Sequence, residues 1–249
     1  MKRILLTTVS LGVLGLVSPA LGADLPYAKA PVISAPVYDW SGFYVGGFGG
    51  GGYGNHNVNN ALGNTGFAPF TANYTSVGGA AGGEAGYNWH SGSYMVGLEG
   101  DLFWSGIRGN DANQIAAGNF PLTSVDADNL RWGGTIRARV GYTIDRWMFF
   151  FTGGYAFGDI VHTNTALGFP TDTFTVHANG LTGGGGIAYA ITNNVIGKFE
   201  YRYYNFNGYN RPGTPLTLSG QLPYTTESTY SVVTLGLDFK FGGPVIAKY

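Results

Sequence analysis

The stretch 130–142, LRWGGTIRARVGY, constrains the fold more than any other part of the chain. In an extended strand successive side chains point to opposite faces, so residues of one parity share a face. Arg131, Arg137 and Arg139 then lie on one face, while the other face has an aromatic residue near each end and no charge. This pattern is typical of a strand that crosses a lipid bilayer with a polar interior behind it.

The composition agrees with a membrane protein built from strands. Charged residues make up 11% of the 249 residues, against roughly 25% in an ordinary soluble domain. Glycine occurs 43 times and is interleaved with 15% aromatic residues, which favours glycine-bearing strands over disorder. The formal net charge of -1 gives no attraction to nucleic acid, and we expect no such partner. The absence of cysteine excludes disulfides, thiolate metal sites and thiol catalysis.

Residues 1–22 have the three parts of a secretory signal peptide. Lys2 and Arg3 form a positive end, Ile4–Val17 is largely apolar, and small residues follow, which favours cleavage after Gly22. The alternative is an uncleaved membrane helix, but the apolar run is shorter than the ~20 residues that such a helix needs. We therefore expect an exported protein.

Residues 23–39 contain three prolines and no period, which predicts an extended periplasmic lead-in, and residues 40–249 are predicted to form a barrel. Eight stretches in it have strand patterns, each close to the ~9–11 residues of a tilted transmembrane strand. These stretches are 40–52, 77–89, 94–104, 130–142, 147–157, 181–191, 195–203 and 231–241. The connections are short at 90–93, 143–146 and 192–194, and long and polar at 53–76, 105–129, 158–180 and 204–230.

This alternation of short and long connections predicts an all-β fold, an eight-stranded antiparallel up-and-down transmembrane β-barrel with four long outer loops. A soluble eight-stranded ligand carrier shows a similar alternation with the faces reversed. The scarcity of charge decides against a carrier, because a water-facing exterior needs far more Lys and Glu. Two aromatic girdles are expected, with Trp89, Tyr94, Tyr142 and Trp147 near the short turns and Trp104, Trp132 and Tyr203 near the long loops.

Motifs at both ends of the mature chain resemble those of one family. The lead-in ADLP…AP before WSGFYVGG, the ending LGLDFKF and the tail GGPVIAKY resemble small outer-membrane β-barrel proteins of alphaproteobacteria, relatives of the opacity-like porins and the OmpA transmembrane domain. The resemblance covers nearly all of the mature chain. It implies an outer-membrane location, contact with outer-membrane lipid and lipopolysaccharide, and insertion by the barrel-assembly machinery. Either Phe241 or Tyr249 would be the terminal aromatic residue that this machinery reads.

Charged residues on the polar faces are predicted to point into the barrel and to form ion pairs there, because an unpaired buried charge is costly. One interpretation is a salt-bridged plug that fixes strand register, and the other is a gated ion path. An eight-stranded barrel barely holds its own side chains, which disfavours a wide pore, although inward glycines leave room for weak conductance. The predicted interior residues are Glu84, Glu99, Asp101, Arg131, Arg137, Arg139, Lys198, Glu200, Arg202, Asp238 and Lys240.

Nothing in the sequence predicts a catalytic, metal-binding or cofactor-binding residue. His56, His90, His162 and His177 fall in predicted loops and turns, without the spacing of a hydrolytic triad or a metal pair, and are interpreted as solvated. The glycine run 183–186 lies within a predicted strand and indicates close packing rather than a phosphate-binding loop.

The predicted function is that of a non-enzymatic outer-membrane protein with a structural and surface role, whose mildly acidic outer loops would meet an extracellular ligand. Two alternatives stay open. One is a narrow channel or a haem-binding receptor, with Tyr209, Tyr224, His162 and His177 as haem candidates. The other is a lipid-modifying enzyme that uses Ser and His.

Overall fold

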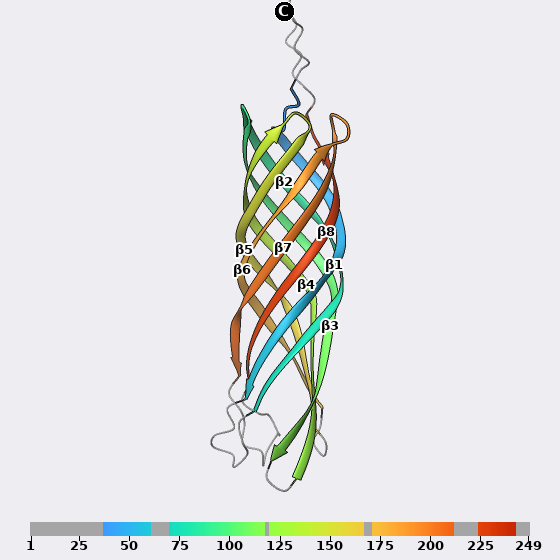
Figure 1. Ribbon diagram of the computed structural model, residues 1–249, viewed down its shortest axis with the longest axis vertical. Coiled ribbons are helices and arrows are strands. Elements are labelled where there is room, and N and C mark those ends of the chain that lie inside the picture. The colour runs from blue at the N-terminus through green and yellow to red at the C-terminus, as the bar shows by residue number, and fades with distance from the viewer. Residues whose placement is uncertain (1–36, 61–69, 118–119, 167–170, 212–223, 243–249) are drawn as a thin grey trace, which may run out of the picture. The chain divides into compact units, whose positions relative to one another are not determined.

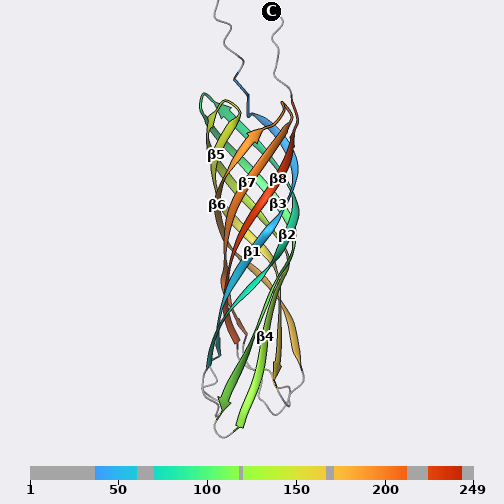
Figure 2. The ribbon, with the colours of Figure 1, turned by 45° about the vertical axis from the view of Figure 1, so that its right-hand side comes forward.

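The computed structural model describes residues 37–60, 70–117, 120–166, 171–211 and 224–242, so the predicted signal peptide and Tyr249 lie outside the described residues. Eight strands pair antiparallel in chain order, and the last pairs with the first to close a barrel (Figure 1). Seen from a second side, the strands keep the same tilt around one axis (Figure 2). The predicted fold is therefore confirmed. The strands are β1 (Gly42–Asn60), β2 (Phe70–Ser91), β3 (Tyr94–Ala117), β4 (Phe120–Ile144), β5 (Trp147–Ala166), β6 (Asp172–Ala190), β7 (Val195–Arg211) and β8 (Tyr224–Lys240). In these residues no helix is long and apolar enough to cross a membrane.

The strands run further toward the outer end than the sequence pattern predicted. Residues assigned to long polar loops continue the ladders, as in the pairs Asn110↔Ala127 and Val161↔Thr175. Backbone pairing needs no apolar face, so strands rich in Asn and Thr extend beyond the part that shows alternation. The prediction that all of 53–76, 105–129, 158–180 and 204–230 is loop is wrong on this point.

The three short turns lie at the same end of the barrel as the start of β1 and the end of β8. The β2–β3 turn contains Gly92 with φ +63° and the β4–β5 turn contains Asp145 with φ 50°, a left-handed conformation that tight hairpins require. Asp is among the few residues other than glycine that adopt it readily. The third turn joins β6 to β7 at 191–194. All three were predicted within one or two residues.

The outer wall of the barrel is apolar between two aromatic girdles. On β3 and β4 the exposed side chains run from Tyr94 to Trp104 and from Trp132 to Tyr142, and each run covers the ~9–11 residues that a tilted strand needs to cross the hydrocarbon layer. Tyr94 and Tyr142 also contact each other, with ring centroids 5.6 Å apart. The seven predicted girdle residues all have exposed side chains, which places them on the wall facing the membrane.

Glycine on the inner wall allows the strands of this narrow barrel to approach closely. A Cβ atom at Gly184 would lie 2.3 Å from the carbonyl oxygen of Tyr201, and one at Gly186 would lie 2.2 Å from that of Phe199. Both contacts are with backbone, which cannot move aside. The glycine run in β6 is therefore a close-packing feature, as the sequence predicted.

Tyr38 and Trp40 precede β1 and are buried in the barrel mouth at the short-turn end. We call these two residues the mouth plug. Trp40 is fully buried in an apolar cluster with Phe150. Its indole N–H donates to the carbonyl oxygen of Asp145 at 3.3 Å, and the Tyr38 hydroxyl donates to that of Asn193 at 3.2 Å. Because the mouth plug binds two different turns, the end of the lead-in is part of the packed barrel.

Replacement of Trp40 by alanine should lower the free energy of unfolding by about 3–5 kcal/mol, the usual cost of deleting a large buried aromatic side chain. Urea unfolding of protein refolded in detergent micelles, followed by circular dichroism, measures the change. The control is Val37→Ala, since Val37 is 69% exposed and its truncation should change stability by no more than about 0.5 kcal/mol. Equal stability of the two variants would show that the plug contributes nothing.

Candidate functional site: the ionic core

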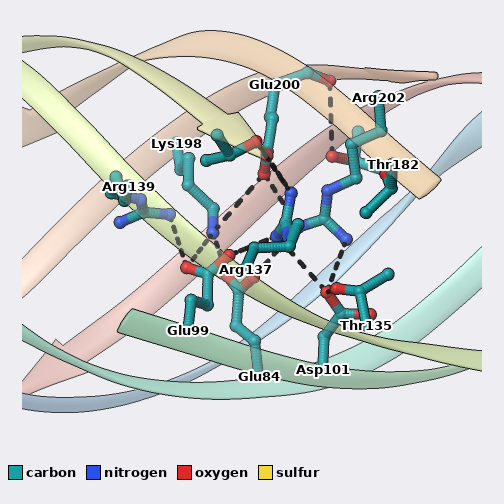
Figure 3. Close-up of polar contacts among 12 residues, drawn as sticks. Glu84, Glu99, Asp101, Thr135, Arg137, Arg139, Thr182, Lys198, Glu200 and Arg202 are labelled. Atoms are coloured by element: carbon teal, nitrogen blue, oxygen red, sulfur yellow. Dashed lines mark hydrogen bonds and ion pairs between the residues drawn. The ribbon is translucent and has the colours of Figure 1, made fainter. Parts of the chain in front are cut away.

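Nine charged side chains converge inside the barrel, and we call this group the ionic core. Figure 3 labels all of them except Asp238. Each is no more than 5% exposed, and each takes part in at least one ion pair. Alternate residues of a strand face the same side of the sheet, and on each of these strands the charged residues occupy the positions that face the lumen. The members are Glu84 of β2, Glu99 and Asp101 of β3, Arg137 and Arg139 of β4, Lys198, Glu200 and Arg202 of β7, and Asp238 of β8.

Arg137 joins two sides of the barrel. It lies opposite Glu99 in the β3–β4 register and binds its carboxylate. Its guanidinium also binds Glu200 of β7 across the lumen, and Nη2 lies 3.3 Å from Oδ2 of Asp101. Strands β4 and β7 share no ladder, so this contact ties together parts of the wall that backbone pairing leaves apart.

Arg202 makes the same connection from β7. Its Nη2 lies 2.8 Å from Oε2 of Glu200 and 3.1 Å from Oε2 of Glu84, and its Nη1 lies 3.3 Å from Oδ2 of Asp101. Its guanidinium carbon is 4.4 Å from the ring centroid of Phe48, an additional cation–π contact. Arg suits this position because a planar guanidinium offers several donors at fixed angles.

Lys198 occupies the space among four carboxylates. It pairs with Glu84, and its Nζ lies 3.3 Å from Glu99, 3.8 Å from Glu200 and 3.9 Å from Asp238. A compact ammonium with three donors can serve several acceptors in this way.

Arg139 connects the ionic core to the apolar cluster at the mouth. It pairs with Glu99, and its guanidinium carbon lies 4.4 Å from the ring centroid of Phe150. The Tyr44 hydroxyl donates to the same glutamate at 2.7 Å. Arg139 therefore contacts both the ionic core and the apolar cluster at the mouth.

The ionic core holds five carboxylates and four cationic groups, close to neutrality. Each buried ion carries a desolvation penalty of several kcal/mol, which only well-placed partners offset. Among the described residues Glu84, Glu99 and Glu200 have carboxylate oxygens within 4.8 Å of one another, a spacing that a divalent cation could bridge. Lys198 already contacts all three, so the protein supplies its own counter-charge there.

Nine of the eleven residues predicted to line the interior lie in the ionic core, and Lys240 and Arg131 do not. Lys240 is buried at the barrel mouth, where its ammonium donates to the carbonyl oxygen of Asp39 and lies 4.5 Å from the ring centroid of Tyr38. Burial raises the pKa of Tyr38 to about 12, so this ring stays neutral at physiological pH. Among the described residues Lys240 thus contacts a carbonyl and a ring, and no carboxylate oxygen lies within ion-pair distance of its ammonium.

The prediction that Arg131 points inward is wrong, because its side chain is exposed on the outer wall. The β4–β5 register passes from Leu130↔Ile160 directly to Trp132↔Asp159, which leaves Arg131 as the extra residue of a β-bulge. A bulge interrupts the alternation of faces, so Arg131 and Trp132 both face outward and Leu130 is buried. Parity counted through the bulge gave the wrong face.

A second buried cluster, which the sequence reasoning missed, lies in the outer half of the lumen. His56 Nδ1 is 3.0 Å from Oδ2 of Asp128 and 2.9 Å from the Ser228 hydroxyl, and His56 Nε2 is 2.9 Å from the Ser76 hydroxyl. His162 binds the other oxygen of Asp128. The interpretation as solvated residues is wrong for His56 and His162. It is also wrong for His90 in the β2–β3 turn, whose side chain is 8% exposed with Nε2 2.9 Å from the Thr143 hydroxyl. It holds for His177, whose side chain is 86% exposed. Continuing the alternation of β1 and β2 into the polar segments would have indicated His56 and Ser76.

Ser76, His56 and Asp128 have the connectivity of a hydrolytic triad, with the acid on Nδ1 and the hydroxyl on Nε2. A triad also needs a nucleophile that a substrate carbonyl can reach. Ser76 is fully buried, and a Cβ atom added at Gly54 would lie only 2.6 Å from its Oγ. The three residues are packed as a structural network that joins β1, β2 and β4.

Replacement of Arg137 by methionine should lower the free energy of unfolding by about 3–5 kcal/mol, because it leaves Glu99 and Glu200 charged and underpaired in the lumen. The measurement is urea unfolding in micelles. Arg131→Met is the matched control on the same strand and should change stability by no more than about 0.5 kcal/mol, because Arg131 is exposed. A loss for Arg137→Met no greater than that of the control would refute a stabilising ionic core.

Comparison with known proteins agrees with the architecture. A family model described as "Outer membrane protein beta-barrel domain" matches residues 25–241. The 31 kDa outer-membrane immunogenic protein of Brucella melitensis is 32% identical over 175 residues, which cover 67% of this chain and 68% of the relative. The 22 kDa outer membrane protein of Rhizobium leguminosarum bv. viciae is 30% identical over 121 residues, 49% of each chain.

Solved structures of outer-membrane barrels are also similar. The outer membrane protein OprG of Pseudomonas aeruginosa covers 82% of this chain and 97% of its own, with a TM-score of 0.46 and 11% sequence identity. The family match and the relatives place the protein in the outer membrane. The chain belongs to the family of outer-membrane proteins built on this β-barrel domain.

Proposed function

We propose that this outer-membrane protein is a closed, non-enzymatic barrel that serves the cell envelope through its outer surfaces rather than through its lumen. The observation that carries the proposal is that buried side chains occupy the lumen at successive levels. An eight-stranded barrel is just wide enough for such filling.

The levels follow one another along each strand. On β3 they run from Met95 beside the mouth plug, through Glu99 and Asp101 of the ionic core, to Phe103 and Ile107. The last two belong to a larger apolar cluster to which all eight strands contribute residues. The cluster of His56, Asp128 and His162 lies beyond it. A solute would have to displace all four layers, which supports the salt-bridged plug over the gated ion path.

The packing of Ser76 supports a non-enzymatic role over a lipid-modifying one. The proposed partners are outer-membrane lipid and lipopolysaccharide on the wall and the barrel-assembly machinery at the short-turn end. Phe241, 47% exposed beside Phe43 at 5.7 Å between ring centroids, is our candidate for the assembly signal. Relatives named as immunogenic support accessible outer loops, where we place an extracellular ligand; the tips of those loops lie outside the described residues.

Reconstitution into a planar bilayer tests the closed lumen. Folded protein, verified by its heat-modifiable migration on gels, should give no conductance steps above those of the empty bilayer, because the lumen is filled. Steps that persist in the folded wild type and change when the ionic core is altered by Arg137→Met would overturn the proposal in favour of a channel.

Incubation with lipopolysaccharide, followed by mass spectrometry of the lipid, tests the absence of an enzyme. We expect no change in acyl chains or phosphates, since Ser76 is out of reach of the lipid. Turnover by the wild type that disappears in Ser76→Ala, with Ser228→Ala as the matched control, would show that the Ser76–His56–Asp128 network is catalytic.

A further inference from the structure

The bulge that turns Arg131 outward lies at the outer aromatic girdle. On one side of β4 the register passes from Leu130↔Ile160 to Trp132↔Asp159, and on the other side the β3–β4 register is also irregular, between Trp104 and Ile107. Two irregularities therefore meet at Arg131. Without the bulge, the alternation of inward and outward side chains would have buried Arg131. The bulge therefore places this cation on the outer wall.

The height of Arg131 is set by the girdles. Trp132–Tyr142 on β4 covers the ~9–11 residues that cross the hydrocarbon layer, with Tyr142 at the short-turn end. Arg131 comes directly after this span, at the level of the lipid headgroups. The mouth plug and short turns mark the opposite, periplasmic end, so these headgroups belong to the outer leaflet.

A hollow of about 350 Å³ lies beyond the girdle, and Arg131 follows its lining residue Asn129 by two positions on β4. Its lining includes Arg108 of β3, Asn129 of β4 and Thr163 of β5. Arg108 and Asn129 are directly opposite in the β3–β4 register. Asn129 is half-buried, and its Oδ1 atom is a buried acceptor without a hydrogen-bond partner in the protein.

Charge on this part of the wall is predominantly positive. Arg108 and Arg131 are exposed, and among the described residues neither forms an ion pair, in contrast to the cations of the ionic core. Asp128 also lines the hollow, but its carboxylate is buried and pairs with His56 and His162. Glu227 is exposed on β8, four strands away from β4 around the barrel. Asp159, beside Trp132, has both oxygens occupied. Its Oδ2 accepts from the Trp132 indole N–H at 2.9 Å, and its Oδ1 contacts His177 Nδ1 at 2.6 Å. Two guanidinium groups therefore remain free to bind an anion.

We propose that Arg108, Arg131 and Asn129 form a binding site for the phosphorylated sugar headgroup of an outer-leaflet glycolipid. Guanidinium groups bind phosphate through paired, charge-assisted hydrogen bonds, and the Asn129 amide suits a sugar hydroxyl. The girdle below the hollow receives the acyl chains of the same molecule. This site rests on the proposed partnership with outer-membrane lipid and assigns it to specific residues.

The test is the binding of bisphosphorylated lipid A to folded protein in detergent micelles, measured by native mass spectrometry. The variant Arg108→Gln/Arg131→Gln should bind at least about tenfold more weakly, the order expected for two basic contacts at a lipid surface. Arg108→Lys/Arg131→Lys should fall between the two, since it keeps the charge and loses the paired geometry. Lipid A without phosphates should bind to the wild type as weakly as the intact lipid binds to the Gln variant.

The matched control is Arg146→Gln, at the periplasmic end, which should bind as the wild type does. Arg146 donates to the Ala190 carbonyl at 3.0 Å and is only partly exposed. Equal weakening by Arg146→Gln, or undiminished binding by the Gln double variant, would overturn the proposal. Displacement of the lipid by inorganic phosphate alone would show that the site reads free anions instead of a lipid. Any of these results leaves the closed, non-enzymatic barrel standing, because conductance and lipid turnover test it separately.

Discussion

Burial of charge inside a narrow barrel is the constraint on which the rest of this structure depends. The ionic core must pair every member, because an unpaired ion in the lumen costs several kcal/mol. Arg137 of β4 and Arg202 of β7 meet this demand by each contacting carboxylates from more than one strand. The result is a set of contacts across the lumen between strands that the backbone ladders do not connect.

The layers on either side shield these ion pairs. Toward the mouth, Arg139 lies over Phe150, which packs with Trp40, and toward the outer end Arg202 lies over Phe48. Water is thus replaced at the edges of the ionic core by aromatic faces, and the low local dielectric strengthens the pairs. The same arrangement explains why inward glycines are needed, since long charged and aromatic side chains take up the small cross-section of the lumen.

The outer wall follows a different rule, because lipid rather than protein is its neighbour. Between the girdles it carries no charge on β3 or β4, and the first exposed cation on β4 appears at Arg131, where the bulge interrupts the alternation. One residue inserted into one strand thus changes the side of the wall on which a guanidinium lies. Inside, Arg131 would have needed a carboxylate; outside, it is exposed on the wall, where we propose that it binds the phosphate of an outer-leaflet glycolipid.

The sequence by itself determined the barrel, its short turns and the inward position of the nine residues of the ionic core. Each of these depends on period-two alternation or on local turn chemistry, which a short stretch of chain contains in full. Only the tertiary structure decided which charges pair, since Glu99 and Glu200 meet at Arg137 through barrel closure. It also decided that Arg131 faces lipid, that Lys240 binds the mouth plug, and that His56 and Asp128 meet in the lumen. The local sequence pattern carries no signal for a bulge or for a strand that continues through polar residues, because both are set by pairing with neighbouring strands.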